Sequence, residues 1–312
     1  MVYRLANKSR VALECMGSAI LVAALSIVTS CEASERVIDM DPLKHPKRVA
    51  SNSKGLFLAL HIDGRLSIVN FAPEDESARV VLKGSLDAYS PSICHDNLFY
   101  MESDSSGTYL VKSSMNAPLS SSRHSLNGSL DYLPSINCET IYLTRRSAWD
   151  VETYIRLYSL DLSDGSTDLL KKASLLSLLD VSDNELYLSY NELNQTKVCR
   201  MRNGEAEEIF GFPDTLYAHD FDADSGLLVF AQTDTTYSSS IINIYDYKTK
   251  TISTIHSGGL VSSLNFGENG EIVAVTTNSE KIPVSILYIG KNEVGYDQAR
   301  EFDLKKVLEL VR

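Results

Sequence analysis

Short hydrophobic runs follow one another along most of the chain, and polar turns separate them. Residues 98–101, 140–144 and 186–190 are examples, each four or five residues long and rich in Leu, Ile and Tyr. Runs of this length are typical of β-strands, because a helix needs a longer stretch to present an apolar stripe. Asp, Asn and Gly mark the intervening turns, whose backbone angles they tolerate. The pattern therefore predicts an all-β chain.

The strands recur in a repeated unit. The tripeptide Pro-Ser-Ile occupies the same place in two successive units, at residues 91–93 and 134–136, which are 43 residues apart. Six units can be traced, with a spacing of about 40–45 residues. A four-stranded unit of this length buries its faces only against its neighbours in a ring. We therefore predict a β-propeller over residues 49–312, with six four-stranded blades, or seven if one copy is degenerate.

The last segment of the chain has a different pattern. Its hydrophobic residues lie two to four positions apart between Lys and Glu: Phe302, Leu304, Val307, Leu308 and Val311. This spacing indicates either a terminal helix or a last strand followed by a charged tail.

Two segments of the repeat resemble the consensus of TolB-like propellers, also called WD40-like β-propeller repeats. Residues 221–230 (FDADSGLLVF) match its aromatic residue, turn and apolar strand, and residues 157–165 (LYSLDLSDG) match its aromatic strand and Asp-Leu-x-x-Gly turn. Asp-Asn, Glu-Asn-Gly or Ile-Asp-Gly replaces the Pro-Asp-Gly turn of that consensus in most copies. The resemblance covers about residues 50–290 and implies a propeller, but it does not identify a partner.

The first thirty residues resemble a bacterial lipoprotein signal. A basic start precedes the uncharged apolar segment 16–28, which is too short to cross a bilayer. Residues 28–31 (VTSC) resemble a lipobox, in which the cysteine is lipidated after cleavage. We predict a signal peptide over residues 1–30, lipidation of Cys31, and a polar tether over residues 31–48. An ordinary signal peptide and an uncleaved anchor are the alternatives.

Charge narrows the classes of partner. The whole chain has a net charge of −12, and removing residues 1–30, with three basic residues and one acidic residue, makes it −14. Such a surface repels phosphate backbones, so nucleic-acid binding is not expected. The predicted location is a bacterial membrane, with the propeller facing the periplasm or the cell surface.

Three cysteines remain after cleavage: Cys94, Cys138 and Cys199. Cys94 and Cys138 lie at inter-strand turns of consecutive units, so neighbouring blades could bring them into disulfide range. Two separate thiols are the alternative. The chain has no Cys-x-x-C motif, so no structural zinc site is expected.

The rest of the sequence contains few candidate metal-binding or catalytic motifs. Residues 220–226 (DFDADSG) resemble a calcium loop, but the Gly is one position late and no Glu stands at the twelfth position. A strand followed by a turn explains the same residues. No His-Glu-x-x-His and no Gly-x-Ser-x-Gly motif occurs, which argues against zinc hydrolases and serine peptidases. No metal or cofactor is predicted.

The sequence thus favours a non-enzymatic, lipid-anchored module that binds a protein partner in the cell envelope. Residues 102–108 and 145–153 form long loops that could supply the contact surface. Trp149 lies in the second loop and is the candidate anchor, because aromatic side chains dominate many interfaces. A hydrolase or a carbohydrate-binding protein that uses the central funnel is the alternative.

Overall fold

The computed structural model describes most of the chain after residue 48, within the compact unit His45–Arg312. The described residues are 49–63, 65–82, 87–116, 121–126, 129–146, 154–183, 185–193, 195–212, 218–233, 239–267, 269–278, 282–292, 295–296 and 299–311. Within these ranges no helix has the length and apolar character needed to span a membrane. The predicted signal peptide, Cys31, the tether and Trp149 lie outside the described residues.

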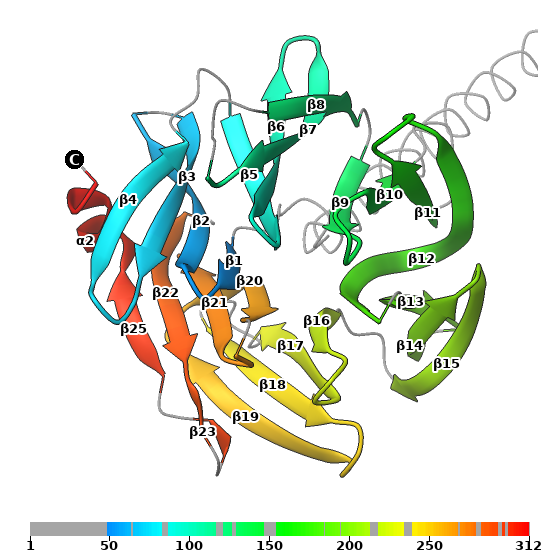
Figure 1. Ribbon diagram of the computed structural model, residues 1–312. Helices are drawn as coiled ribbons and strands as arrows, with labels where there is room; N and C mark the ends of the chain where they lie inside the picture. The colour runs from blue at the N-terminus through cyan, green and yellow to red at the C-terminus, as the bar shows by residue number, and fades with distance from the viewer. Residues whose placement is uncertain are drawn as a thin grey trace, which may run out of the picture. The chain divides into compact units, whose positions relative to one another are not determined.

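Antiparallel sheets of consecutive strands account for nearly all of the described residues (Figure 1). Each four-stranded unit is called a blade here, numbered from the N-terminus, and each runs from an inner to an outer strand. Blades 1 and 2 consist of β1 (Val49–Asn52), β2 (Gly55–Ile62), β3 (Arg65–Ala72) and β4 (Ser77–Leu82), then β5 (Asp87–Cys94), β6 (Asn97–Asp104), β7 (Gly107–Ser114) and β8 (Ser121–Ser125).

Blades 3 and 4 share one long strand. They consist of β9 (Ser129–Pro134), β10 (Thr140–Arg146), β11 (Tyr154–Asp161), β12 (Thr167–Ser182), β13 (Glu185–Glu192), β14 (Gln195–Arg202) and β15 (Glu205–Phe212). The first half of β12 pairs with β11 as far as Ser174, and the second half pairs with β13 from Ser174 to Ser182. The outer strand of blade 3 therefore continues directly into the inner strand of blade 4.

Blades 5 and 6 complete the set. They consist of β16 (Ala218–Asp222), β17 (Leu227–Thr233), β18 (Ser240–Asp246) and β19 (Thr251–Ser257), then β20 (Leu260–Phe266), β21 (Ile272–Thr277), β22 (Pro283–Ile289) and β25 (Arg300–Asp303). The small hairpin of β23 (Lys291–Asn292) and β24 (Gly295–Tyr296) interrupts blade 6 between β22 and β25. The described residues thus form a β-propeller with six blades, the lower of the two predicted counts.

Hydrophobic side chains are buried where the blades face one another. Leu58 and Phe71 of blade 1 belong to the same cluster as Val275 and Ile286 of blade 6, which closes the ring. Aromatic rings fill the space between blades 4 and 5, where Phe210 stacks on Tyr247 with 5.7 Å between ring centroids. Packing between blades therefore supplies the core, as the propeller prediction requires.

The C-terminus contains both elements that its pattern allowed. β25 is the outer strand of blade 6, and the helix α2 (Leu304–Glu309) follows it directly. The Asp303 side chain caps this helix by accepting a hydrogen bond from the Lys305 N–H at 2.8 Å. Leu304 and Val307 point into the cluster between blades 6 and 1, and α2 lies beside β4 (Figure 1).

Blade 1 and blade 6 meet without exchanging a strand. Phe302 of β25 packs edge-on against Phe71 of β3, with ring centroids 5.1 Å apart. Arg300 pairs with Glu74 at 3.1 Å and donates to the Pro73 carbonyl at 2.9 Å. Side chains alone therefore close the ring among the described residues.

Candidate functional site

Register shifts interrupt the inner strands of blades 2 to 6, whereas β1 of blade 1 pairs without one. In β12 the bulge falls between Leu178 and Asp180, and in β16 it falls between Ala218 and Asp220. An extra residue at such a place re-aims the side chain that follows. The aspartates after the bulges are therefore placed alike in successive blades.

These aspartates connect neighbouring blades. Asp220 accepts hydrogen bonds from the backbone N–H of Phe221 at 3.1 Å and, in blade 6, from that of Phe266 at 2.7 Å. Asp180 repeats the arrangement, accepting from Val181 at 2.7 Å and from Ala223 of blade 5 at 3.2 Å. Each of the two carboxylates thus accepts hydrogen bonds from backbone N–H groups of its own blade and of the next blade. Both are structural links between blades.

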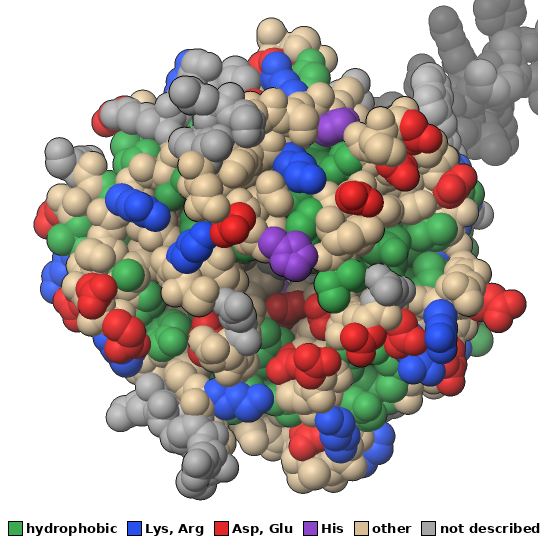
Figure 2. All heavy atoms as spheres, in the orientation of Figure 1, with side chains coloured by type: hydrophobic (Ala, Val, Ile, Leu, Met, Phe, Trp, Pro, Cys, Tyr) green, Lys and Arg blue, Asp and Glu red, His purple; other side chains and the backbone are tan. Residues whose placement is uncertain are grey.

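His219 occupies the bulge of β16. Desolvation lowers the pKa of its imidazole to about 4, so the ring is neutral at pH 7. Figure 2 shows a hollow at the centre of one face, with acidic side chains in it and beside it.

The calcium-like segment 220–226 is a strand followed by a turn. Asp220 reaches blade 6, whereas Asp222 accepts from the Ser225 N–H at 3.0 Å and so caps its own turn. Asp224 accepts from the Ser182 hydroxyl of blade 4 at 3.3 Å. The three carboxylates have separate partners and do not converge, which agrees with the strand-and-turn interpretation.

The structure joins Cys94 and Cys138 in a disulfide, with their Cα atoms 5.8 Å apart. Cys94 ends the inner strand of blade 2, and Cys138 lies in the turn between β9 and β10 of blade 3. His95 lies beside them, and its Nε2 is 2.8 Å from the Ile136 carbonyl oxygen. Cys199 is free and buried.

Cys94, His95 and Cys138 are also the one group in the described residues whose side chains come close enough to share a metal ion. Their ligand atoms lie within 4.8 Å of one another. Because the two sulfur atoms are bonded to each other, neither is available as a thiolate ligand, and a single imidazole remains. The cluster is a covalent link between two blades.

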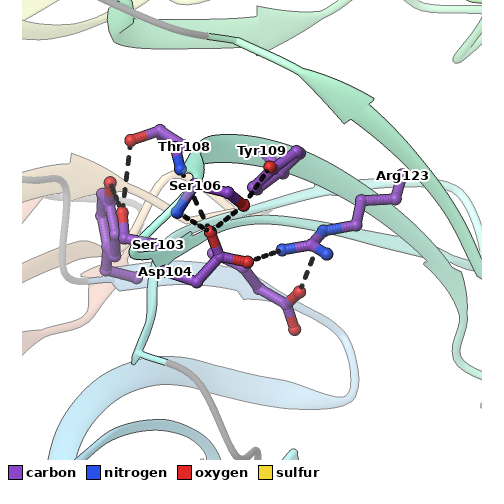
Figure 3. A network of polar contacts seen from close by, with 9 residues as sticks. Ser103, Asp104, Ser106, Thr108, Tyr109 and Arg123 are labelled. Atoms are coloured by element: carbon purple, nitrogen blue, oxygen red, sulfur yellow. Dashed lines mark hydrogen bonds and ion pairs between the residues drawn. The ribbon is translucent and has the colours of Figure 1, made fainter.

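The prediction of a long loop over residues 102–108 is wrong. Residues 102–104 end β6 and residues 107–108 begin β7, so the segment is a tight hairpin, and a polar network fixes it (Figure 3). The Asp104 carboxylate accepts from the Ser106 N–H at 2.7 Å and from Arg123 of β8 at 2.8 Å. The hydrogen bonds from Ser106 and then from Arg123 lower the pKa of Asp104 to about 2. The Arg123 guanidinium also lies over the Tyr109 ring, 3.6 Å from its centroid. The loop is therefore rigid and its charges are paired.

The second strand of each blade ends, and the third begins, at the same end of the propeller, because the blades share one strand direction. The described residues at this end form what we call the tip face. Leu193 in blade 4 and Ile282 in blade 6 belong to it, with 92% and 52% of their surface exposed. The connection in blade 3 contains Trp149, outside the described residues.

Leu193 is unusual in its backbone as well. Its φ of 52° lies in the left-handed region. For a residue with a β-carbon that conformation costs about 1–2 kcal/mol. Sequence patterning did not single out Leu193, because it stands alone among polar neighbours in the turn; its only signal is a large apolar residue where Asn or Gly is usual.

Comparison with known proteins identifies the fold. No family model matches the sequence, and no curated protein matches it either. Among solved structures, TolB from Acinetobacter baumannii superimposes with a TM-score of 0.59 at 13% identity, over 81% of this chain and 64% of that one. A putative TolB from Agrobacterium tumefaciens gives 0.56 at 12% identity, over 76% and 89% of the two chains.

An enzyme has the same architecture. Oligogalacturonate lyase from Vibrio parahaemolyticus superimposes with a TM-score of 0.55 at 11% identity, over 80% of this chain and 91% of that chain. Identities this low establish the arrangement of the backbone and nothing about chemistry. This chain is therefore a β-propeller of the architecture found in TolB and in oligogalacturonate lyase.

Proposed function

We propose that this chain is a non-enzymatic propeller that binds a protein partner through its tip face and is held at a bacterial membrane by a lipid on Cys31. The observation that carries the binding role is Leu193, a strained leucine with almost its whole side chain in water. Folding gains nothing from such a residue, whereas a partner can bury it. Ile282 gives the same face a second exposed apolar group.

The inner strands support a binding role over a catalytic one. Asp180 and Asp220 follow the register shifts of two inner strands, and each accepts a hydrogen bond from a backbone N–H of the next blade. A general acid or base needs a carboxyl that reaches the substrate. The rigid β6–β7 hairpin also suits binding, because a preorganised loop loses little conformational entropy on association.

Photo-crosslinking in cells tests the binding role. A photoreactive residue in place of Leu193 is expected to give one discrete protein adduct at physiological abundance of the chain. The matched control is the same residue at Leu169, an equally apolar position with 58% of its surface exposed, on the outer rim of blade 3. Adducts of equal yield and identity at both positions, or none at Leu193, would contradict the proposal.

Lipidation is tested separately. Metabolic labelling with an alkyne fatty acid is expected to tag the chain and to fail for Cys31→Ser, which should leave the membrane fraction. Labelling that survives this substitution would place the anchor elsewhere.

A carbohydrate-binding or hydrolytic channel is the second candidate, favoured by the acidic side chains around the hollow in Figure 2. Asp and Glu side chains are the usual catalytic groups of glycoside hydrolysis. A thermal-shift screen of neutral and cationic oligosaccharides tests it: stabilisation lost on changing channel carboxylates, with adduct formation at Leu193 absent, would favour this role.

A further inference from the structure

The outer strand of every blade leaves one row of backbone N–H and C=O groups without a strand partner. Such an edge can pair with a strand from another protein, and natural proteins usually prevent this with charges, bulges or covering elements. All six outer strands lie in the described part of the chain, so their protection can be compared directly.

Five of the six outer strands are protected. Each contains charged residues: Arg79 in β4, Arg123 in β8, Asp168, Lys171 and Lys172 in β12, three Glu in β15, and Arg300, Glu301 and Asp303 in β25. The pairing of β4, β12 and β15 with their neighbours is also interrupted by bulges. In addition, β25 is only four residues long and leads into α2.

β19 has none of these features. Its sequence is TISTIHS, without Asp, Glu, Lys, Arg or Pro, and it is seven residues long. It pairs with β18 in an unbroken register from Ser240↔Ser257 to Asp246↔Thr251. The Ile252 side chain has 54% of its surface exposed, and the strand is rich in β-branched residues. Blade 5 therefore presents a regular, uncharged and accessible strand edge.

Two exposed lysines lie beside this edge, Lys248 and Lys250 in the turn before β19. The Asp246 carboxylate next to this turn accepts hydrogen bonds from the backbone N–H groups of Lys248 and Thr249. By contrast, the outer strand of blade 4 presents Glu205, Glu207 and Glu208. The chain as a whole has a net charge of −12. The two lysines beside β19 therefore favour a partner that carries carboxylates at this edge.

We propose that β19 is a docking site for an extended, uncharged segment of a partner protein that has acidic residues at one end. The segment adds as a fifth strand to blade 5, its backbone bonds to the free edge, and its carboxylates lie near Lys248 and Lys250. A second copy of this chain fits less well, because both copies carry the same net charge and the same basic flank. The proposal does not depend on the tip face.

Fluorescence anisotropy with the full chain tests this docking site. The probe is a labelled peptide of about eight alternating Thr and Val residues followed by two Glu, long enough to cover β19. Ile252→Glu is expected to weaken binding at least tenfold, and Leu169→Glu, the matched change on the protected outer strand of blade 3, is expected to leave it unchanged. Thr254→Glu is the second variant if Ile252→Glu does not fold.

Two further measurements test the backbone pairing and the charge complementarity. A peptide N-methylated at alternate residues is expected not to bind, because it lacks the N–H donors that pair with the strand edge. Lys248→Gln/Lys250→Gln is expected to weaken binding severalfold and to reduce its salt dependence. Absence of binding by the wild-type chain, equal losses in the two Glu variants, or retained binding of the N-methylated peptide each overturns the proposal. A dimer seen by light scattering and lost in Ile252→Glu overturns it in favour of a second copy.

Discussion

Breaking the covalent link between blades 2 and 3 is expected to lower the free energy of unfolding by about 4 kcal/mol. The Cys94–Cys138 disulfide joins residues 44 apart in sequence. The chain-entropy relation gives a loop of that length a loss of about 13 cal/mol/K in the unfolded state, or about 4 kcal/mol at 25 °C. Folded domains are stable by about 5–15 kcal/mol in total, so the link contributes a large share.

Urea unfolding followed by tyrosine and tryptophan fluorescence measures this contribution. The wild-type chain is compared with and without a phosphine reductant, alongside Cys94→Ala/Cys138→Ala. The reductant should destabilise the wild-type chain and leave the double variant unchanged. Cys199→Ala is the control, since Cys199 is a buried free thiol and its removal should not alter the response to reductant.

The outcome that refutes this reasoning is specific. If reduction changes the free energy of unfolding by less than about 1 kcal/mol, the disulfide does not constrain the unfolded chain as the entropy relation requires. If the double variant responds to reductant as strongly as the wild-type chain, the effect does not arise from this bond.

Three further perturbations follow from the fold. Asp220→Ala should cost about 1–3 kcal/mol, because it leaves the partly buried Phe266 N–H without its acceptor. Asp224→Ala removes an exposed hydrogen bond and should cost much less in the same denaturation assay. Leu304→Ala should cost about 2–5 kcal/mol by opening a cavity between blades 6 and 1, whereas the exposed Leu310→Ala should be nearly neutral by thermal melting. The folded state keeps His219 unprotonated down to about pH 4, whereas in the unfolded state this side chain binds a proton below about pH 6.5. The free energy of unfolding should therefore fall by up to about 3 kcal/mol as the pH drops from about 6.5 to about 4. A His219→Gln chain with the same pH dependence would disprove this assignment.

The predicted and observed strands agree best where strands are buried. Central strands such as β6, β13 and β21 were predictable because their hydrophobic runs face neighbouring blades on both sides. Outer strands gave no such signal, since their side chains meet water: β8 reads SSRHS and β15 begins with EAEE. The period of the repeat nevertheless implied four strands, so the fold could be inferred although several individual strands could not.

The sequence signal also failed at the joint between blades 3 and 4. Residues 167–182 (TDLLKKASLLSLLDVS) form the single strand β12, although a propeller blade normally ends in a turn. This segment contains no Gly, Pro or Asn, so nothing in it favours a turn. The lack of turn residues was the one feature of the sequence that could have predicted a continuous strand from blade 3 to blade 4.

Side-chain links between blades lay beyond sequence patterning. The disulfide could be anticipated as an alternative because Cys94 and Cys138 hold corresponding places in consecutive units. The bonds of Asp180 and Asp220 could not, since they depend on bulges that direct each carboxylate toward the next blade. Leu193 was missed because exposure and backbone angle are properties of the folded turn.

Three joints of the ring are built differently. A disulfide joins blades 2 and 3, the continuous strand β12 joins blades 3 and 4, and side chains that include those of a helix of six residues join blades 6 and 1. Covalent structure therefore reinforces the packing of three successive blades, whereas noncovalent contacts join the two blades at the ends of the described chain. The terminal helix covers the apolar cluster between those two blades, so its removal would expose that cluster to water.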